Sequence, residues 1–262
     1  MTKQTQISPQ TTTLILLCTT IFAYFNYENL PLNFSLVLGA LFAPYIFRKI
    51  DSTNSHRYIF VALLLGGLLF FRRSASLYYA FWCFCILYIL ESQWGRLNQL
   101  PLFLLAVVSA FVNHIAYVWS FPIRLWLSGV VAKSLTFIGM NAQADGNIIL
   151  LNGNDFNVEP GCVGLNMLVT GLVLGLFIVA HFERRYERTF NFLQVTAAMF
   201  LVLFLSVLSN YIRLLTLVVF YILPENPLHE LVGIVCLVLY VLLPFYGIVA
   251  RIVARYFQSV SR

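Results

Sequence analysis

The sequence predicts an all-α integral membrane protein with about eight transmembrane helices. Of its 262 residues, 60% are hydrophobic and only 10% are charged, whereas soluble domains average roughly 25% charged residues. The mean hydropathy is +0.85, and the apolar residues form runs that suit a hydrocarbon core of about 30 Å. The composition excludes an ordinary soluble protein. We assign the net charge of +6 to short loops and not to nucleic-acid binding.

The predicted spans follow these apolar runs along the chain. A polar segment, residues 1–12, precedes them, and we expect it to be a disordered tail. Residues 13–262 are expected to form a single polytopic membrane domain. The eight predicted spans are Thr13–Phe25, Leu32–Phe47, Tyr58–Phe71, Leu77–Leu90, Leu100–Trp119, Val163–His181, Phe192–Leu223 and Leu231–Val249.

Basic residues indicate the orientation, because Lys and Arg gather in cytoplasmic loops. With a cytoplasmic N-terminus, the larger group falls inside: Lys3, Arg48, Lys49, Arg57, Arg96, Arg184, Arg185, Arg188, Arg251, Arg255 and Arg262. The smaller group falls outside: Arg72, Arg73, Arg124 and Lys133. The Arg72-Arg73 pair violates the rule, but arginines are clustered after the sixth span and after the last span, which favours this orientation for the last three spans. It places Cys162 on the outer side.

Residues 120–161 are expected to lie at the outer surface. The first part carries Arg124 and Lys133 in an apolar run, which is typical of an interfacial helix. Further along, β-prone runs flank Asn152-Gly153-Asn154, and an Asn-Gly pair tolerates the positive φ angles of a tight hairpin. We therefore predict a short outer hairpin before Cys162, with an irregular loop as the alternative.

Three polar residues are predicted to lie at one depth of the membrane. Arg213 is inside an apolar run, where an arginine is costly and indicates a functional site. It follows Asn191 by 22 residues, or about 33 Å of helix, which reaches the outer boundary. Cys162 opens the preceding span, and His229 precedes the last one. Residues 162–250 are therefore expected to contain the catalytic core helices.

These three residue types suit nucleophilic catalysis by cysteine. A thiol with a pKa near 8.5 is activated by a neighbouring cation or a helix N-terminus, and Cys162 is expected to have both. His229 suits general acid–base transfer, and Arg213 suits stabilisation of an oxyanion. Taken singly, each residue has a simpler explanation: a small helix residue, an arginine that reaches the interface, and a loop histidine.

Further polar residues are predicted to contact substrate. Asn210 lies three residues before Arg213 and shares its helical face, so it is placed to hold the guanidinium or to contact substrate. Glu159 either pairs with Arg213 or is a solvated loop carboxylate, and Asn166 is assigned to the substrate site. We expect neither a metal nor a cofactor, because no set of His, Cys, Asp and Glu residues has ligand spacing.

The motifs "PGCVGLNML", "NYIRLLTLV" and "HELVG", in this order, resemble the Cys, Arg and His motifs of the exosortase/archaeosortase family. Members of this family are polytopic enzymes that process proteins carrying a C-terminal sorting signal. The resemblance covers about the last 110 residues. It implies that Cys162 is the nucleophile, that Arg213 and His229 are its partners, and that Asn210 is the Asn of an N-x-x-R pattern. Val163 stands where the family commonly has Ser, which indicates a divergent branch.

The expected function is that of a membrane-embedded cysteine protease or transpeptidase that acts through a thioester. We expect it in a prokaryotic inner membrane with its active site on the outer face. The expected partners are the lipid bilayer and a membrane-tethered substrate protein with a C-terminal motif, a single span and a basic tail, and no nucleic acid. Two alternatives are a small-anion transporter or channel that uses Arg213, and a structural partner in an envelope-assembly complex.

Overall fold

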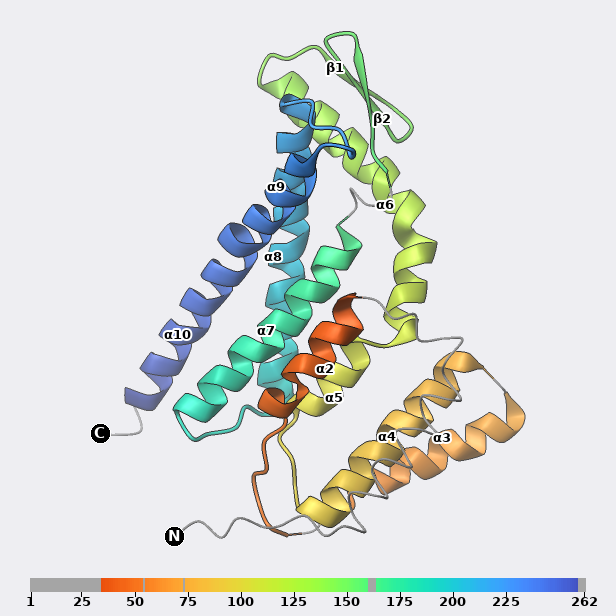
Figure 1. Cartoon of the computed structure of the whole chain (residues 1–262), viewed down its shortest axis with the longest axis vertical. Helices are drawn as coiled ribbons and strands as arrows, with labels where there is room; N and C mark the ends of the chain where they lie inside the picture. The colour runs from red at the N-terminus through yellow and green to blue at the C-terminus, as the bar shows by residue number, and fades with distance from the viewer. Residues whose placement is uncertain (1–33, 54, 73, 160–163, 259–262) are drawn as a thin grey trace. The chain divides into compact units, whose positions relative to one another are not determined.

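The chain divides into two compact units, residues 1–112 and 113–262. The computed structural model describes residues 34–53, 55–72, 74–159 and 164–258, and Figure 1 labels the elements. The first predicted span, Thr13–Phe25, lies outside the described residues, as does Cys162. The predicted tail, residues 1–12, lies outside them too.

The described part of the first unit is a set of packed helices. Helix α3 packs on α4, and α5 packs on both α2 and α4. Helix α4 begins where the Ser74 hydroxyl accepts a hydrogen bond from the Leu77 N–H (3.3 Å), and Pro101 lies in the first turn of α5. Both are favoured ways to start a helix. The bounds are α2 Phe34–Ile46, α3 Ile59–Phe71, α4 Ala75–Trp94 and α5 Leu100–Val107.

A buried ion pair joins the two longer connections of this unit. Glu91 is fully buried, and its carboxylate accepts hydrogen bonds from Arg57 Nε (3.1 Å) and from the Leu97 N–H (2.9 Å). The Asn98 amide, also buried, donates to the Ile46 carbonyl (3.0 Å). The segment before α3 is thereby fastened to the end of α4 and to the residues that follow it. We call these two segments together the loop junction (residues 46–58 and 91–98).

The second unit contains the long helices and a small sheet. Its elements are α6 Ala110–Phe137, β1 Ala142–Asp145, β2 Ile148–Leu151, β3 Asn154–Asn157, α7 Leu165–Arg185, α8 Phe192–Val219, α9 Pro227–Leu237, η2 Val238–Leu242 and α10 Leu243–Gln258. Among the described residues, three helical stretches are long and apolar enough to cross a membrane: α7, α8, and a continuous stretch from α9 through η2 into α10. In length and composition they agree with the last three predicted spans.

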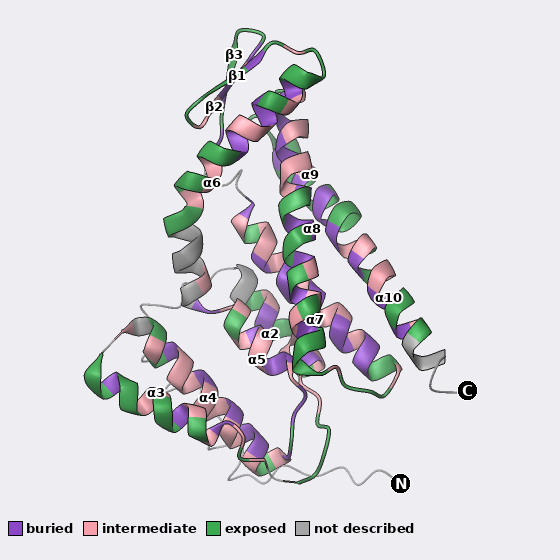
Figure 2. Cartoon of the chain, turned by 180° about the vertical axis from the view of Figure 1, so that it is seen from behind, coloured by how far each residue is buried: buried purple, intermediate pink, exposed green. Residues whose placement is uncertain are grey.

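The exposed helix surfaces are those of a protein surrounded by lipid. In the first unit, Phe70 of α3 is 87% exposed, and in the second unit Phe200 of α8 is 67% exposed. Figure 2 shows exposed positions running along α3, α8 and α10. Apolar faces of this size are unfavourable in water but are what a helix presents to hydrocarbon.

The earlier predicted spans agree with the structure only in part. Helices α2 and α3 are apolar but shorter than a full span. The predicted fifth span, Leu100–Trp119, does not form one helix, because α5 ends at Val107 and α6 runs on to Phe137. Between them the Ser109 hydroxyl accepts a hydrogen bond from the Val112 N–H (3.4 Å), which is how a side chain starts a new helix. The residues of the predicted interfacial helix form the second half of α6, and their interfacial location and a total of about eight spans stay predictions.

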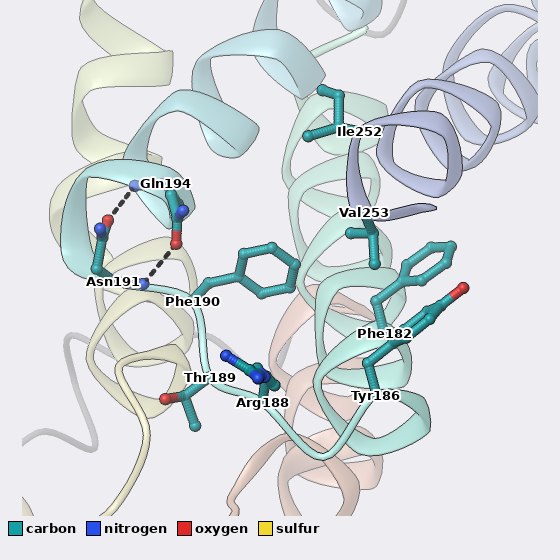
Figure 3. A pocket seen from close by; sticks show the side chains of 9 residues that line it. All are labelled: Phe182, Tyr186, Arg188, Thr189, Phe190, Asn191, Gln194, Ile252 and Val253. Carbon is teal, nitrogen blue, oxygen red and sulfur yellow. Dashed lines mark hydrogen bonds between the residues drawn. The ribbon is translucent and has the colours of Figure 1, made fainter. Parts of the chain in front are cut away.

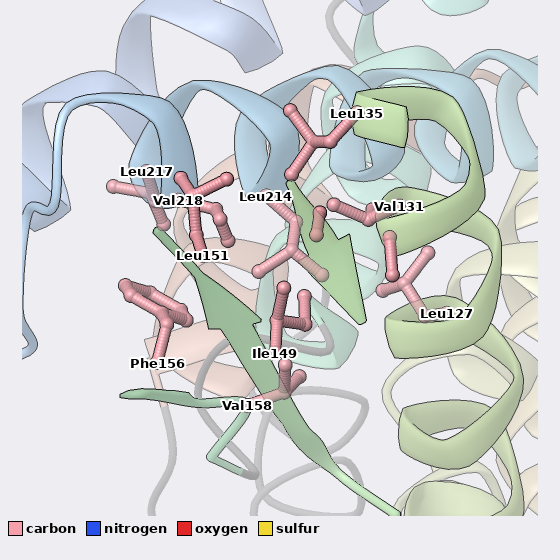
Figure 4. Packing of buried hydrophobic residues seen from close by; sticks show 12 residues of the cluster. Leu127, Val131, Leu135, Ile149, Leu151, Phe156, Val158, Leu214, Leu217 and Val218 are labelled. Atoms are coloured by element: carbon pink, nitrogen blue, oxygen red, sulfur yellow. The ribbon is translucent and has the colours of Figure 1, made fainter. Parts of the chain in front are cut away.

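The sheet is held against α6 and α8 by a buried apolar cluster, drawn in Figure 4. Alternate residues of β2 and β3 point into this cluster, as the two-residue period of a strand requires. The cluster members are Leu127, Val131, Ala132, Leu135, Ala142, Ile149, Leu151, Phe156, Val158, Leu214, Leu217 and Val218. Each large apolar side chain removed from water contributes roughly 2 kcal/mol, so the cluster fixes the sheet on the helices.

The predicted hairpin is confirmed, and it has a third strand. Strands β2 and β3 are antiparallel, and Asn152 (φ 52°) and Gly153 (φ 85°) form the turn between them. Two consecutive positive φ angles are typical of the turn that an Asn-Gly pair favours. The sequence analysis missed β1, which pairs with β2 on its other side through a turn at Gly146-Asn147.

Candidate active site

Arg213 lies near the C-terminal end of α8, far from the start of that helix. At its start, the Asn191 side chain accepts from the Gln194 N–H and the Gln194 side chain accepts from the Asn191 N–H, both at 2.9 Å. This reciprocal arrangement is a capping box. The 22 residues from Asn191 to Arg213 make about 33 Å of helix. Arg213 is only 4% exposed, so its cation lies inside the protein.

The end of α8 turns the chain toward His229. Tyr221 has a left-handed φ of 50°, and the Ile222 N–H donates to the Leu217 carbonyl (2.9 Å). This bond is the Schellman closure, which satisfies the last carbonyls of a helix. A short connection follows and leads into α9.

His229 lies in the first turn of α9. The Asn226 side chain accepts a hydrogen bond from the Leu228 N–H (3.0 Å). The backbone carbonyl of Asn226 accepts one from the His229 N–H (2.8 Å). Pro227 occupies the first helical position, which suits its fixed φ. This cap orients the first turn and leaves the His229 ring buried, at 7% exposure.

Arg213 and His229 are in contact. Arg213 Nη2 lies 3.5 Å from Nδ1 and 3.5 Å from Nε2 of the His229 ring. A nitrogen that is equally distant from both ring nitrogens is not aligned with the lone pair of either one. In the ring plane it would also be too close to Cε1, so it lies over the ring face, as a cation does on an aromatic ring. The structure thus brings together two of the three predicted catalytic residues.

A glycine of α9 makes room for this pair. A Cβ on Gly233 would lie 3.2 Å from Arg213 Nε and 3.2 Å from Met167 Sδ, and it would overlap Met167 Cε. Helices α7, α8 and α9 therefore approach each other at one point beside the guanidinium. The sequence analysis missed Met167, because an apolar residue in an apolar run gives no signal.

Asn210 lies against the beginning of α7. Gly164 caps α7 with a left-handed φ of 71°, and a Cβ there would overlap the amide of Asn210. Only a glycine combines this φ with so close an approach. Because Asn210 precedes Arg213 by three residues, the start of α7 lies within one helical turn of the Arg213 position.

The other predicted site residues differ in their placement. Glu159 is exposed, and both Glu159 and Glu230 lie near enough to His229 for their charges to act on its ring. Asn166 is exposed in the first turn of α7, and its side chain makes no hydrogen bond to another described residue. Cys162 lies outside the described residues. Two other cysteines, Cys83 and Cys236, are buried within helices.

A pocket of about 240 Å³ lies at the other end of the same helices, between the end of α7, the start of α8 and α10 (Figure 3). Its lining includes Gln194, which precedes Arg213 by 19 residues, or about 28 Å of helix. The lining residues include no cysteine, histidine or carboxylate. Within the described ranges, no group of three His, Cys, Asp or Glu side chains is arranged to hold a metal ion. The chemistry-bearing side chains are therefore those around Arg213.

The long apolar helices and a buried arginine–histidine contact define a multi-pass membrane protein with a polar site at one end of its helices. The chain matches the family model described as Transmembrane exosortase (Exosortase_EpsH) over residues 24–246. This range covers most of the chain, which therefore belongs to the transmembrane exosortase family. Comparisons with curated proteins and with solved structures gave no match.

Family membership confirms the resemblance seen in the three motifs and makes the chain an enzyme. Exosortases are multi-pass membrane cysteine peptidases or transpeptidases, and they process proteins that carry C-terminal sorting signals. The matched range covers most of each unit and contains all six residues predicted for the site. The anion-transporter and structural-partner alternatives are dropped on this ground.

Replacement of Gly233 by alanine is expected to lower signal processing about tenfold, equal to about 1.4 kcal/mol. The added methyl group would press on Met167 and on the Arg213 guanidinium. Processing of a co-expressed substrate would be followed by immunoblot, with Gly247→Ala as the control because nothing lies within 4 Å of a Cβ there. The double variant Gly233→Ala/Met167→Ala should recover much of the lost rate. A double variant no better than Gly233→Ala would contradict this steric account.

Proposed function

We propose that this protein is a membrane-embedded cysteine protease or transpeptidase that cleaves the C-terminal sorting signals of exported proteins through a thioester acyl-enzyme. Cys162 is the nucleophile, Arg213 stabilises the developing negative charge, and His229 transfers the proton. Asn210, Glu159 and Asn166 border the substrate. Neither a cofactor nor a metal takes part.

The reaction proceeds in two acyl transfers. His229 takes the proton of the Cys162 thiol, and the thiolate adds to the scissile carbonyl. The Arg213 guanidinium stabilises the resulting oxyanion. When the carbon–nitrogen bond breaks, His229 gives a proton to the leaving amine and a thioester remains. Water or the amine of an acceptor then attacks the thioester, returns a proton to His229 and releases Cys162.

The contact between Arg213 and His229 is the main support for these roles. It joins a permanent cation to an acid–base group in a buried place, where electrostatic stabilisation is stronger than in water. The covalent connection to Gly164 also keeps Cys162 near the Arg213–His229 contact. Cys162 precedes Gly164 by two residues, so peptide geometry keeps its Cα within about 7.6 Å of the Gly164 Cα, and Gly164 lies against Asn210.

The substrate class and the location extend this proposal. The substrate is a membrane-tethered protein with a short motif, a single span and a basic cytoplasmic tail, and the enzyme itself has about eight spans with its sheet on the outer side. The site lies on the outer face of a prokaryotic inner membrane. Clustered arginines between α7 and α8 and in the C-terminal segment support this orientation.

The deciding experiment is substitution of Cys162 with alanine in cells that express a substrate with a C-terminal sorting signal. Processing should stop, because no other group in the proposed mechanism forms the acyl-enzyme. The full-length substrate would accumulate and be seen on immunoblots. Wild-type enzyme treated with hydroxylamine should release a hydroxamate of the shortened substrate, since hydroxylamine cleaves thioesters.

A matched control is Cys236→Ala, because Cys236 is a buried helix thiol outside the proposed mechanism. It should leave processing unchanged. Continued processing by Cys162→Ala would overturn the proposed nucleophile and, with it, the thioester mechanism.

A further inference from the structure

The two edges of the small sheet differ in what lies beside them. Strand β1 lies along α6, where the Thr136 hydroxyl donates to the Ala142 carbonyl (2.8 Å) and the Ser128 hydroxyl donates to the Gly146 carbonyl (2.7 Å). Strand β3 is paired only with β2 among the described residues. A strand with one unpaired edge presents a row of backbone donors and acceptors to any extended chain beside it.

The register identifies which groups of β3 point outward. The Val158 N–H donates to the Asn147 carbonyl (2.9 Å), and Ile149 lies opposite Phe156. In an antiparallel pair, hydrogen-bonded positions alternate, so Phe156 and Val158 bond toward β2. The backbone N–H and C=O groups of Asp155 and Asn157 therefore point away from the sheet.

This outer edge contacts the connection between α8 and α9, the two helices that contain Arg213 and His229. The Tyr221 hydroxyl donates to the outward carbonyl of Asp155 (3.3 Å), which places the connection between α8 and α9 beside β3. Glu159 follows β3 by two residues, and its carboxylate lies near enough to influence the charge of the His229 ring. Cys162 follows Asn157 by five residues, or at most about 17 Å of extended chain.

We propose that the outer edge of β3 binds the substrate segment that precedes the scissile bond, as an added fourth strand. This inference rests on the proposed function, because a sorting signal must be extended to present its scissile carbonyl. Main-chain hydrogen bonds to the Asp155 N–H and to the N–H and C=O groups of Asn157 hold such a segment whatever its side chains are, as in other cases of strand addition. The Asp155 carbonyl keeps its bond to the Tyr221 hydroxyl (3.3 Å).

The direction of the added strand follows from the proposed topology. The chain runs from β3 into α7, which crosses from the outer to the inner face. A substrate with an exported domain followed by a C-terminal span runs in the same direction. A substrate segment that lies parallel to β3 would deliver its next residues toward the start of α7, as the chain itself goes from β3 to Gly164, and this is the direction we propose.

Asn157→Pro tests this edge specifically. Proline removes the outward N–H of position 157 but no bond between β2 and β3, and proline is tolerated where a strand N–H faces outward. Asn157→Ala is the matched control, because it keeps the N–H and loses only the side-chain bond to Asn147 (2.7 Å). Ala144→Pro makes the same change at an outward position of β1.

Processing of a co-expressed substrate should fall at least tenfold in Asn157→Pro relative to Asn157→Ala, and Ala144→Pro should process normally. Labelling of Cys162 by a small alkylating reagent should be equal in all three variants. Equal labelling would show that the site is intact and that only substrate binding is weakened. Equal processing by Asn157→Pro and Asn157→Ala would overturn the proposal. Failure of the proposed function has a different signature, namely continued processing by Cys162→Ala.

If Asn157→Pro loses Cys162 labelling, a second measurement tests whether the substrate adds to β3 as a strand. An Asn157→Cys enzyme would be oxidised with substrates that carry single cysteines along the segment before the scissile bond. Strand addition predicts disulfide yields that alternate with a period of two residues. Yields without this alternation would overturn the added strand.

Discussion

Replacing Arg213 with lysine is expected to lower the rate of signal processing by about 100-fold, the effect of losing one well-placed oxyanion donor. Lysine keeps the positive charge but lacks the planar group that lies over the His229 ring. The measurement is the initial rate of substrate shortening in membranes that contain equal amounts of enzyme. Arg185→Lys, at an exposed position of α7, is the control and should process at the normal rate.

A double variant separates a shared role from two independent ones. Arg213→Lys and His229→Gln are each expected to be nearly inactive. Residues that act as one unit show losses that do not add, so the double variant should be no slower than the slower single variant. Losses that multiply would show that Arg213 and His229 act in different steps, and the contact between them would then have no catalytic meaning.

The sequence predicted that Arg213 and His229 share one depth of the membrane. Counting residues along α8 placed Arg213 near the level of His229, and a helix is regular enough for such counting to work. What counting could not give was contact, because contact depends on how α7 and α9 approach α8. That approach is set by Gly164 and Gly233, whose missing side chains admit Asn210 and Met167. Glycines are common in membrane helices, so the sequence did not distinguish these two.

The small sheet shows the same limit for the fold. The Asn152-Gly153 turn was predictable because few residue pairs accept two positive φ angles in succession. Strand β1 has the sequence Ala-Gln-Ala-Asp, which has no β-branched or aromatic residue and therefore little strand propensity. It is a strand because β2 pairs with it and α6 lies along its other side. Tertiary contacts of this kind leave no local pattern.

Removal of the Glu91 carboxylate is expected to destabilise the first unit by about 3 kcal/mol, the usual loss when a buried ion pair is broken from one side. In Glu91→Leu the Arg57 guanidinium loses its counter-charge, and the Leu97 N–H loses its acceptor. The loop junction would open, since Glu91 is the group that both segments share. Thermal unfolding of the purified protein in detergent measures this loss, together with protease cleavage within residues 46–58.

The double variant Arg57→Leu/Glu91→Leu shows how much of this loss comes from leaving the Arg57 cation unpaired. Replacing both charges by apolar groups removes the unpaired cation as well, and such replacements are often close to neutral. We therefore expect the double variant to be more stable than Glu91→Leu alone. If it is less stable, the pair contributes net stability through its hydrogen bonds to the Leu97 N–H and carbonyl, and the loop junction depends on the charges themselves.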